Sequence, residues 1–348
     1  MKKTKIGIIG CGNISNAYFN AAKRFDIIEV VACADINADA AKAKAEEHGV
    51  KALTVDKLLA DKSIEIVINL TVPKAHFEIT TKILQAGKHA YGEKPFALTV
   101  AEANKINKLA KEKDLRVGCA PDAFLGGGLQ PCRKLIDDGW IGKVLSGTAF
   151  MLGGGPEKWH PNPKFFYEYG GGPMLDMGPY YITALVHLLG PVKSVTAVTG
   201  RGFAERISGP GTGRMHIPVE VVTHNAGVLE FQSGAIITVT ISFDVQRHSH
   251  SPIELYGSEG SLQVPDPNTF GGPVKVFRCG YENWVEAPLS HIYTQNSRSI
   301  GAVDMAYAIQ SGRKHRASGE LAAHGLEVML AFEESGKAGA KVAIKNKC

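Results

Sequence analysis

Residues 5–15, KIGIIGCGNIS, decide the fold of the first part of the chain. The apolar run of this segment ends in Gly10, and apolar residues then recur at helical spacing, so the pattern predicts a strand, a turn and a helix. At such a turn Gly10 makes the tight bend, and Gly12 lets a pyrophosphate approach backbone N–H groups at the helix N-terminus. Ser15 stands where dinucleotide-binding turns have a further glycine, so the turn alone is modest support for a nucleotide site.

An acidic residue in the right place strengthens this interpretation. Asp35 ends the second predicted strand, residues 29–35, at about the distance of twenty residues that dinucleotide-binding folds use. A carboxylate there accepts hydrogen bonds from ribose hydroxyls and repels a 2′-phosphate, which predicts NAD rather than NADP as the cofactor. The alternative is a glycine turn beside an unrelated surface acid.

Strand and helix patterns alternate up to about residue 120 and predict a parallel, doubly wound α/β sheet. The run 64–71 is almost wholly apolar, as expected of a strand buried on both faces. Pro73 then opens a helix that Gly87 closes. A strand end at residues 89–95 and a strand at 115–120 complete this part.

The pattern changes after Pro121 and predicts an α+β arrangement with a large open sheet. A segment rich in glycine, proline and aromatic residues, 153–173, precedes a helix at 179–189. An antiparallel meander follows, and two helices close the chain. The predicted strands are 143–151, 192–200, 217–224, 227–232, 235–244, 252–257, 260–264 and 273–278, and the closing helices are 299–312 and 320–337. We expect a dinucleotide-binding domain at 1–121 and a substrate-binding and oligomerisation domain at 122–348, with the closing helices free to pack back on the first.

Composition excludes several classes of protein. The 348 residues carry 39 Lys and Arg against 34 Asp and Glu, a net charge of +5 spread thinly along the chain, which argues against nucleic acid. No apolar run is long and clean enough to span a membrane, and the N-terminal apolar stretch is too short for a signal peptide. The six cysteines form no CxxC pair, which predicts free buried thiols and a cytoplasmic address.

Glu93-Lys94-Pro95 follows the fifth strand, at the edge where parallel sheets bind ligands. A lysine in low-dielectric surroundings and beside a positive nicotinamide has a lowered pKa. Lys94 then accepts a hydroxyl proton as hydride leaves and returns it in the reverse direction. The alternative is a solvated loop lysine.

A second segment, residues 170–181, carries flexible glycines followed by an acid and two tyrosines. If Pro179 starts a helix, Asp176 lies just before its N-terminus and Tyr180 within its first turn. Both can then face one cleft, where Tyr180 hydrogen-bonds a sugar hydroxyl or relays a proton. The alternative is that Asp176 only caps the helix.

Weaker signals lie outside these segments. Trp159 offers an aromatic plane to a sugar face, and His160 offers acid–base function. Asp122 follows the last strand of the first domain and is a candidate contact of the nicotinamide ribose or substrate. His248 shares a face with His250, but no third and fourth ligand follow, so we expect no metal and treat His248 as a candidate substrate contact.

These motifs, in this order and spacing, resemble the Gfo/Idh/MocA oxidoreductases over essentially the whole length. The resemblance implies a Rossmann domain plus an open-sheet domain, NAD(P) binding, and oxidation or reduction of a sugar, cyclitol or related polyol. It matches Lys94 to the catalytic lysine of the family and Asp176 to its substrate-orienting acid. Many relatives have a His–Asp pair where this chain has Tyr180 and Thr183, which puts simple inositol dehydrogenase activity in doubt. The predicted cofactor contacts are Gly10, Gly12, Asn13, Ile14, Asp35, Thr71, Pro73, His76, Glu93 and Lys94.

The leading hypothesis is an NAD-dependent oxidoreductase that transfers hydride between the nicotinamide and a secondary alcohol or ketone of a sugar-like substrate. Lys94 is its general base, Tyr180 and His160 assist the proton, and Asp176 orients the hydroxyls. A second hypothesis is an enzyme that retains NAD and cleaves glycosides by transient oxidation and elimination. A third is a non-catalytic, NAD-binding sugar-regulatory protein, against which the retained Lys94 argues. We expect a homodimer or homotetramer through the open sheet.

Overall fold

The structure is a computed structural model and describes residues 2–348. The chain divides into two compact units. Unit 1 contains the residues up to Leu125 together with Gln295–Ala323, and unit 2 contains Gly126–Thr294 together with His324–Cys348. Each unit is therefore built from two separate stretches of chain.

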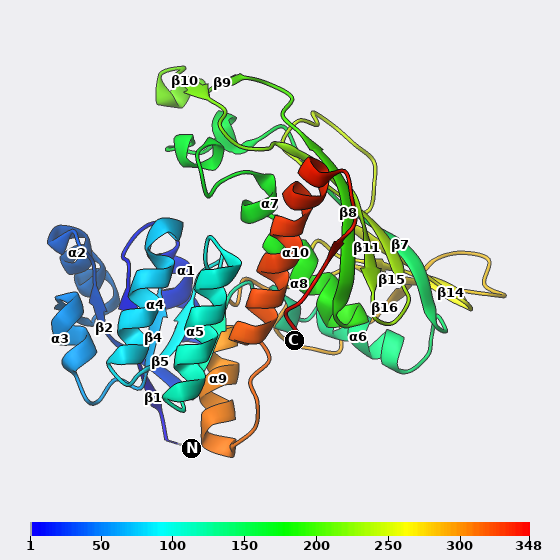
Figure 1. Ribbon diagram of the computed structural model, residues 1–348. Coiled ribbons are helices and arrows are strands. Elements are labelled where there is room, and N and C mark those ends of the chain that lie inside the picture. The colour runs from blue at the N-terminus through cyan, green and yellow to red at the C-terminus, as the bar shows by residue number, and fades with distance from the viewer. Residues whose placement is uncertain (1) are drawn as a thin grey trace. The chain divides into compact units, whose positions relative to one another are not determined.

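Unit 1 holds a parallel sheet of six strands among the described residues, in the order β3-β2-β1-β4-β5-β6 (Figure 1). This order confirms the predicted doubly wound fold. Only the short strand β3 was missing from the prediction. The strands are β1 Thr4–Ile9, β2 Ile28–Ala34, β3 Lys51–Leu53, β4 Ile66–Asn69, β5 His89–Gly92 and β6 Val117–Cys119.

Helices connect these strands, and local signals set their ends. Asn37 caps α2 through its side chain, and Thr99 with Glu102 forms the capping box of α5. Right-handed crossovers place α1 and α2 on one face of the sheet and α4 and α5 on the other. The helices are α1 Ser15–Ala22, α2 Ala38–His48, α3 Val55–Ala60, α4 His76–Gln85 after the 3₁₀ turn η1 Pro73–Ala75, α5 Val100–Glu112, the 3₁₀ turn η2 Ala123–Leu125 and α9 Ile300–Ser311.

Unit 2 is built on a nine-stranded sheet in the order β16-β15-β14-β13-β7-β12-β11-β8-β17, counted over the residues that the structure describes. The predicted open, mainly antiparallel sheet is confirmed. Its strands are β7 Val144–Leu152, β8 Val192–Gly200, β11 His224–Phe231, β12 Ile236–Ser242, β13 Ile253–Gly257, β14 Gly260–Val264, β15 Val274–Arg278, β16 Val285–Ala287 and β17 Val342–Ala343.

The sheet is not the simple meander that the sequence predicted. Strand β7 lies between β12 and β13 and pairs with β12 in parallel. A helical connection separates β7 from β8, which frees β7 to enter the sheet far from its neighbour in sequence. Alternating apolar residues show that a segment is a strand, but they do not show beside which strand it lies.

The predicted strand 217–224 is wrong. Strand β10, His216–Pro218, pairs with β9, Glu205–Ile207, in a separate two-stranded sheet, and β11 begins only at His224. Pro218 has no backbone N–H, which ends the ladder at that point. The short strands β9, β10, β16 and β17 were not predicted.

The helices of unit 2 cover one face of its large sheet. The amide of Ala197 on β8 donates to the Ser335 hydroxyl of α10, and Gly227 on β11 lies against Phe332. The opposite face exposes Val198, Val228 and Ile236. The helical elements are α6 Leu129–Asp137, η3 Pro156–Lys158, η4 Lys164–Tyr167, α7 Pro173–Asp176, α8 Gly178–Leu189, η5 Pro210–Thr212 and α10 Gly319–Ala338, which starts in unit 1.

Composition led to two expectations, one about the burial of the cysteines and one about membrane-spanning helices. Four cysteines are free and buried, as predicted, but Cys279 and Cys348 are exposed, so the expectation of buried thiols is wrong for these two. Over residues 2–348, no helix is both long enough and apolar enough to cross a membrane.

Candidate functional site

The two glycines of the turn between β1 and α1 have different roles. Gly10 has φ +104°, and a Cβ there would lie 2.5 Å from the carbonyl oxygen of Leu70. At Gly12, by contrast, a Cβ would meet nothing within 4 Å. Gly10 is thus needed by the fold, while Gly12 keeps open the space that a dinucleotide phosphate would fill.

Ser15 explains how the turn works without a further glycine. Its side chain is buried, and its hydroxyl donates to the carbonyl of Gly12 at 2.7 Å. The serine therefore closes the turn at the first residue of α1. The residues present fit a dinucleotide at this helix N-terminus.

The Asp35 carboxylate is fixed next to the turn. One oxygen accepts from the amide of Cys11 at 2.7 Å, and the other accepts from the amide of Asn37 at 2.8 Å. Each carboxylate oxygen keeps acceptor capacity beyond these bonds. The acid is held by backbone donors at the carboxyl end of β2, where it is available to ribose hydroxyls.

A buried histidine joins the loops that follow β4 and β5. His76 Nδ1 lies 2.6 Å from the carbonyl oxygen of Pro95, and Nε2 lies 2.9 Å from that of Thr71. Burial lowers the pKa of His76. Asn69 accepts from the amide and the hydroxyl of Thr71, at 3.2 and 2.6 Å. His76 therefore connects the loop of the predicted cofactor residues Thr71 and Pro73 to the loop that follows β5.

Glu93 fixes the backbone at Lys94. The Glu93 carboxylate accepts from the Tyr18 hydroxyl at 2.7 Å and from the Lys94 amide at 3.1 Å. Cys119 donates its thiol to the Glu93 carbonyl at 3.4 Å. Burial raises the pKa of Tyr18 well above its ordinary value, so its phenol keeps the proton that it donates. Lys94 itself is half-buried, directly after β5.

Asp122 has a structural role in unit 1. It is 2% exposed, and its carboxylate accepts from the amides of Ser299 at 3.2 Å and Gly301 at 3.0 Å, at the start of α9. Burial raises its pKa to about 6. These bonds satisfy the first orphan amides of α9, and the predicted contact of Asp122 with ribose or substrate stays a prediction.

Asp176 and Tyr180 lie on consecutive helices of unit 2. Asp176 is the last residue of α7 and is half-buried, whereas Tyr180 is buried in the first turn of α8. Met177, not Asp176, occupies the N-cap position of α8. Asp176 therefore lies one residue before the N-cap of α8.

The weaker candidates of unit 2 lie on its surface loops. Trp159 is 73% exposed, and His160 accepts from the amide of Asn162 at 3.1 Å while its ring packs edge-on against aromatic neighbours. His248 and His250 are exposed and stack at 6.2 Å between ring centroids. In residues 2–348, no group of three His, Cys, Asp or Glu side chains is placed to hold a metal ion.

Tyr18 and Asn69 carry the candidate site but were missed in the sequence. Tyr18 looks like any residue of the apolar face of a helix, and Asn69 like the end of a buried strand. The one available signal was Asn69 itself, a polar residue in an otherwise apolar strand. Such residues are hydrogen-bonded when buried, which marks an organised loop.

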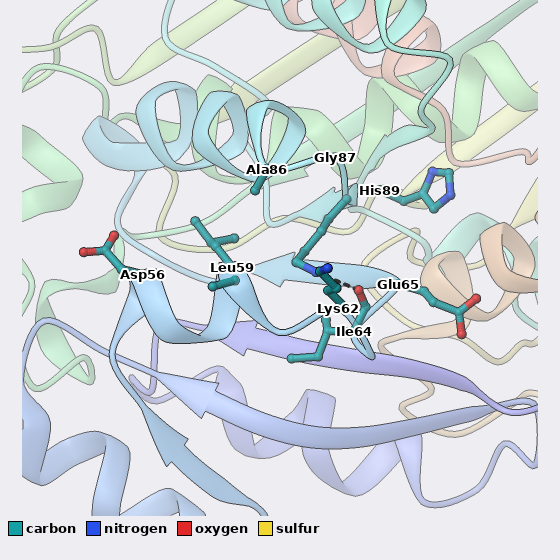
Figure 2. A pocket seen from close by; sticks show the side chains of 10 residues that line it. Asp56, Leu59, Lys62, Ile64, Glu65, Ala86, Gly87 and His89 are labelled. Carbon is teal, nitrogen blue, oxygen red and sulfur yellow. Dashed lines mark hydrogen bonds between the residues drawn. The ribbon is translucent and has the colours of Figure 1, made fainter.

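A pocket of about 690 Å³ lies at the amino ends of β4 and β5, the ends opposite those that precede the predicted cofactor residues. Figure 2 shows Asp56 and Leu59 of α3 and Ala86 and Gly87 after α4 around it. Ile64, Glu65, Lys88 and His89 line it at the beginnings of β4 and β5, whereas the predicted cofactor residues Thr71, Pro73, Glu93 and Lys94 follow the ends of these strands. Lys88 there donates to the carbonyls of Asp61 and Ile64, at 2.7 and 2.9 Å, which gives it a structural role.

Two family models match the chain. The model described as "Oxidoreductase family, NAD-binding Rossmann fold" matches residues 4–120, and the model "GFO/IDH/MocA C-terminal domain" matches residues 129–263.

Relatives with named activities include sugar oxidoreductases. D-xylose dehydrogenase of Paenarthrobacter nicotinovorans is 30% identical over 47% of this chain and 44% of that protein. 1,5-anhydro-D-fructose reductase of Ensifer adhaerens is 27% identical over 74% of each chain. The chain spans about half the length of several curated relatives that it matches. Among solved structures, levoglucosan dehydrogenase in complex with NADH superposes with a TM-score of 0.84 at 22% identity, over 99% of this chain and 100% of that one.

Proposed function

The chain belongs to the Gfo/Idh/MocA family, and from that premise we propose that it is an NAD-dependent oxidoreductase of a secondary alcohol or ketone on a sugar, cyclitol or related polyol. One observation carries the proposal: the turn between β1 and α1 is closed by Gly10 and Ser15 and left open at Gly12, with the Asp35 carboxylate fixed beside it. The names of the relatives, a D-xylose dehydrogenase and a 1,5-anhydro-D-fructose reductase, support a sugar-like substrate.

Unit 1 supplies the proposed cofactor residues. When bound, the nicotinamide supplies the hydride acceptor for oxidation and the hydride donor for reduction. The residues that would hold the dinucleotide are Gly10, Gly12, Asn13 and Ile14 at the turn, Asp35 after β2, Thr71, Pro73 and His76 after β4, and Glu93 and Lys94 after β5. Asp35 favours NAD over NADP, because its charge repels a 2′-phosphate.

Lys94 is the proposed general base. Its backbone is fixed by the bond from its amide to the buried Glu93 carboxylate, which Tyr18 holds in turn. The fixed backbone sets the point from which the flexible Lys94 side chain reaches its amine toward the substrate. Lys94 would accept the proton of the substrate hydroxyl during oxidation and return it during reduction.

Unit 2 supplies the proposed substrate residues. Asp176 would orient the substrate hydroxyls, and Tyr180 would hydrogen-bond them or assist the proton from the first turn of α8. Trp159 would stack on a sugar face, since most of its ring is exposed. His160 and His248 are further candidates for polar contacts on the surface loops, and Asp122 remains a candidate in unit 1.

The test is turnover by the purified protein with NAD and a panel of polyols, sugars and p-nitrophenyl glycosides. Net NADH formation supports the dehydrogenase, whereas release of p-nitrophenol without NADH indicates glycoside cleavage by transient oxidation. Lys94→Ala should abolish turnover, and Lys82→Ala, on the exposed surface of α4, should leave it unchanged. Full activity in Lys94→Ala would overturn the assignment of the base. NAD binding without any turnover would favour a regulatory protein.

The cofactor preference has a separate test. Asp35→Ser should weaken NAD binding and strengthen NADP binding, because it removes both the ribose acceptor and the repelling charge. Asp39→Ser, which changes an exposed acid in the first turn of α2, is the matched control. An unchanged ratio of the two affinities in Asp35→Ser would refute the role of this carboxylate.

Assembly and compartment complete the proposal. The open face of the unit 2 sheet presents Val198, which is 75% exposed, with Val228 and Ile236, and a second copy covering this face would make a homodimer or homotetramer. Light scattering should find a smaller assembly for Val228→Glu and an unchanged one for Ile292→Glu in an exposed loop. The free thiols support a reducing compartment, the cytoplasm.

A further inference from the structure

A buried arginine joins three separate segments of unit 2. Arg206 lies on β9, and its side chain is 6% exposed. One guanidinium nitrogen donates to the Glu157 carboxylate at 3.3 Å and to the Gly154 carbonyl at 3.2 Å. The second terminal nitrogen donates to the Phe243 carbonyl at 3.0 Å and to the Asp244 carboxylate. The arginine therefore connects the loop after β7, the strand β9 and the end of β12.

Both carboxylates around Arg206 are themselves held in place. Asp244 also accepts from the hydroxyl of Thr223 at 2.7 Å and from the amide of Gly202 at 3.1 Å. Glu157 is buried and also accepts from the hydroxyl of Tyr167. Burying a carboxylate without a cationic partner is costly, and loss of the arginine leaves two such charges uncompensated.

The network continues to Asp176 through short backbone steps. Tyr167 and Phe166 belong to an apolar cluster against which Met177 packs, and Met177 follows Asp176 directly. The amide of Gly172 donates to the Phe166 carbonyl at 2.7 Å, and the amide of Asp176 donates to the Gly172 carbonyl at 3.0 Å. Segment 153–172 therefore links Gly154 and Glu157, which bond Arg206, to Gly172, which accepts from the Asp176 amide.

The outer side of the same segment has a different character. Trp159 and Tyr169 are 73% and 65% exposed, and Phe165 is also exposed. Its backbone is fixed from inside while aromatic rings face solvent, which suits a surface that binds a sugar-like ligand.

We propose that Arg206 is a positioning residue: by pairing with Glu157 and Asp244 it fixes segment 153–172, and through it Asp176, in the geometry that the substrate requires. The inference rests on the function proposed above. It assigns to β9 and β10, which lie outside the large sheet, the task of holding the substrate-binding segment.

The first test is kinetic. Arg206→Met should raise the KM for the sugar-like substrate by about tenfold or more and lower kcat, because small displacements of orienting groups are costly. The dissociation constant of NADH should stay within about twofold, since the cofactor residues lie in unit 1. Arg206→Lys, which keeps the charge but cannot donate on two sides, should fall between the two proteins. Arg278→Met removes a surface arginine–glutamate pair of unit 2 and should behave as the wild type.

One further variant and one further measurement keep the test decisive if Arg206→Met does not fold. If Arg206→Met does not fold, the triple change Arg206→Met, Glu157→Gln and Asp244→Asn leaves no buried charge unpaired and isolates the positioning effect. Hydrogen exchange should quicken about tenfold or more in residues 153–172 and stay unchanged in β1 and β2.

The exchange readout separates this inference from the proposed function. If the wild-type protein turns over no sugar, the proposed function fails, and exchange alone decides the role of Arg206. Exchange of residues 153–172 at the wild-type rate in the folded Met or triple variant would overturn the inference. So would a wild-type KM and kcat in either variant.

Discussion

Two alanine substitutions at the glycine turn test the proposed roles of Gly10 in folding and of Gly12 in dinucleotide binding. In Gly10→Ala the new residue must adopt φ +104°, and its Cβ must lie 2.5 Å from the Leu70 carbonyl oxygen. The backbone strain costs about 1–3 kcal/mol, and the clash with a fixed strand end costs about as much again. We therefore expect the free energy of unfolding to fall by about 2–6 kcal/mol, a large part of the stability of a typical domain.

Gly12→Ala should behave in the opposite way. Its φ lies outside the left-handed region, and its Cβ meets nothing within 4 Å. Folding should thus be unaffected or stabilised by up to about 1 kcal/mol, because alanine restricts the unfolded chain. The methyl group fills the space proposed for the pyrophosphate, so the dissociation constant of NADH should rise about tenfold or more, equivalent to about 1.4 kcal/mol.

Urea unfolding and a fluorescence titration with NADH measure the two effects independently. Wild-type affinity for NADH in Gly12→Ala would refute the position of the pyrophosphate. A wild-type urea midpoint in Gly10→Ala would refute the argument from strain. Loss of both stability and NADH affinity in both variants would mean that Gly10 and Gly12 do not have separate roles.

Three further substitutions test other parts of unit 1. Burial raises the pKa of Asp122 from 3.8 to about 6, so the folded state keeps a proton that the unfolded state has lost, and wild-type stability should fall by up to about 3 kcal/mol as pH rises through this interval. Urea unfolding at pH 4 and pH 7 measures this fall, which Asp122→Asn should remove. An unchanged difference in the free energy of unfolding between the two pH values would contradict the argument. Tyr18→Phe leaves a buried oxygen of Glu93 without its donor and should cost about 1–3 kcal/mol in urea unfolding; a loss near zero would show that the bond is replaced. Lys88→Met leaves two backbone carbonyls unpaired and should cost a similar 1–3 kcal/mol, and any accompanying loss of NADH affinity would speak against a purely structural role.

Local signals in the sequence were sufficient for the frame of unit 1. The bend at Gly10, the acid at Asp35 and the capping box of α5 each depend on residues a few positions apart or on one strand end. Helix and strand periodicity then fixed the alternation of elements, and the doubly wound order follows from general rules of chain connection.

The parts that failed depend on contacts between residues far apart in the chain. Tyr18 and Glu93 are separated by 75 positions, and Arg206 and Glu157 by 49. Nothing near Arg206 in the sequence distinguishes it from a surface arginine. The parallel pairing of β7 with β12 is of the same kind, because it is decided by how the sheet closes and not by the pattern of either strand.

The division of unit 1 into two stretches of chain has a consequence for how the protein is made. The amides that the Asp122 carboxylate accepts belong to Ser299 and Gly301, and the Ser299 hydroxyl reaches the carbonyl of Tyr18. During synthesis these partners leave the ribosome long after β1 to β6. Until residues 299–301 are made, the Asp122 carboxylate lacks its two backbone donors, so the stretch up to Leu125 completes its hydrogen bonding only once the start of α9 has been synthesised.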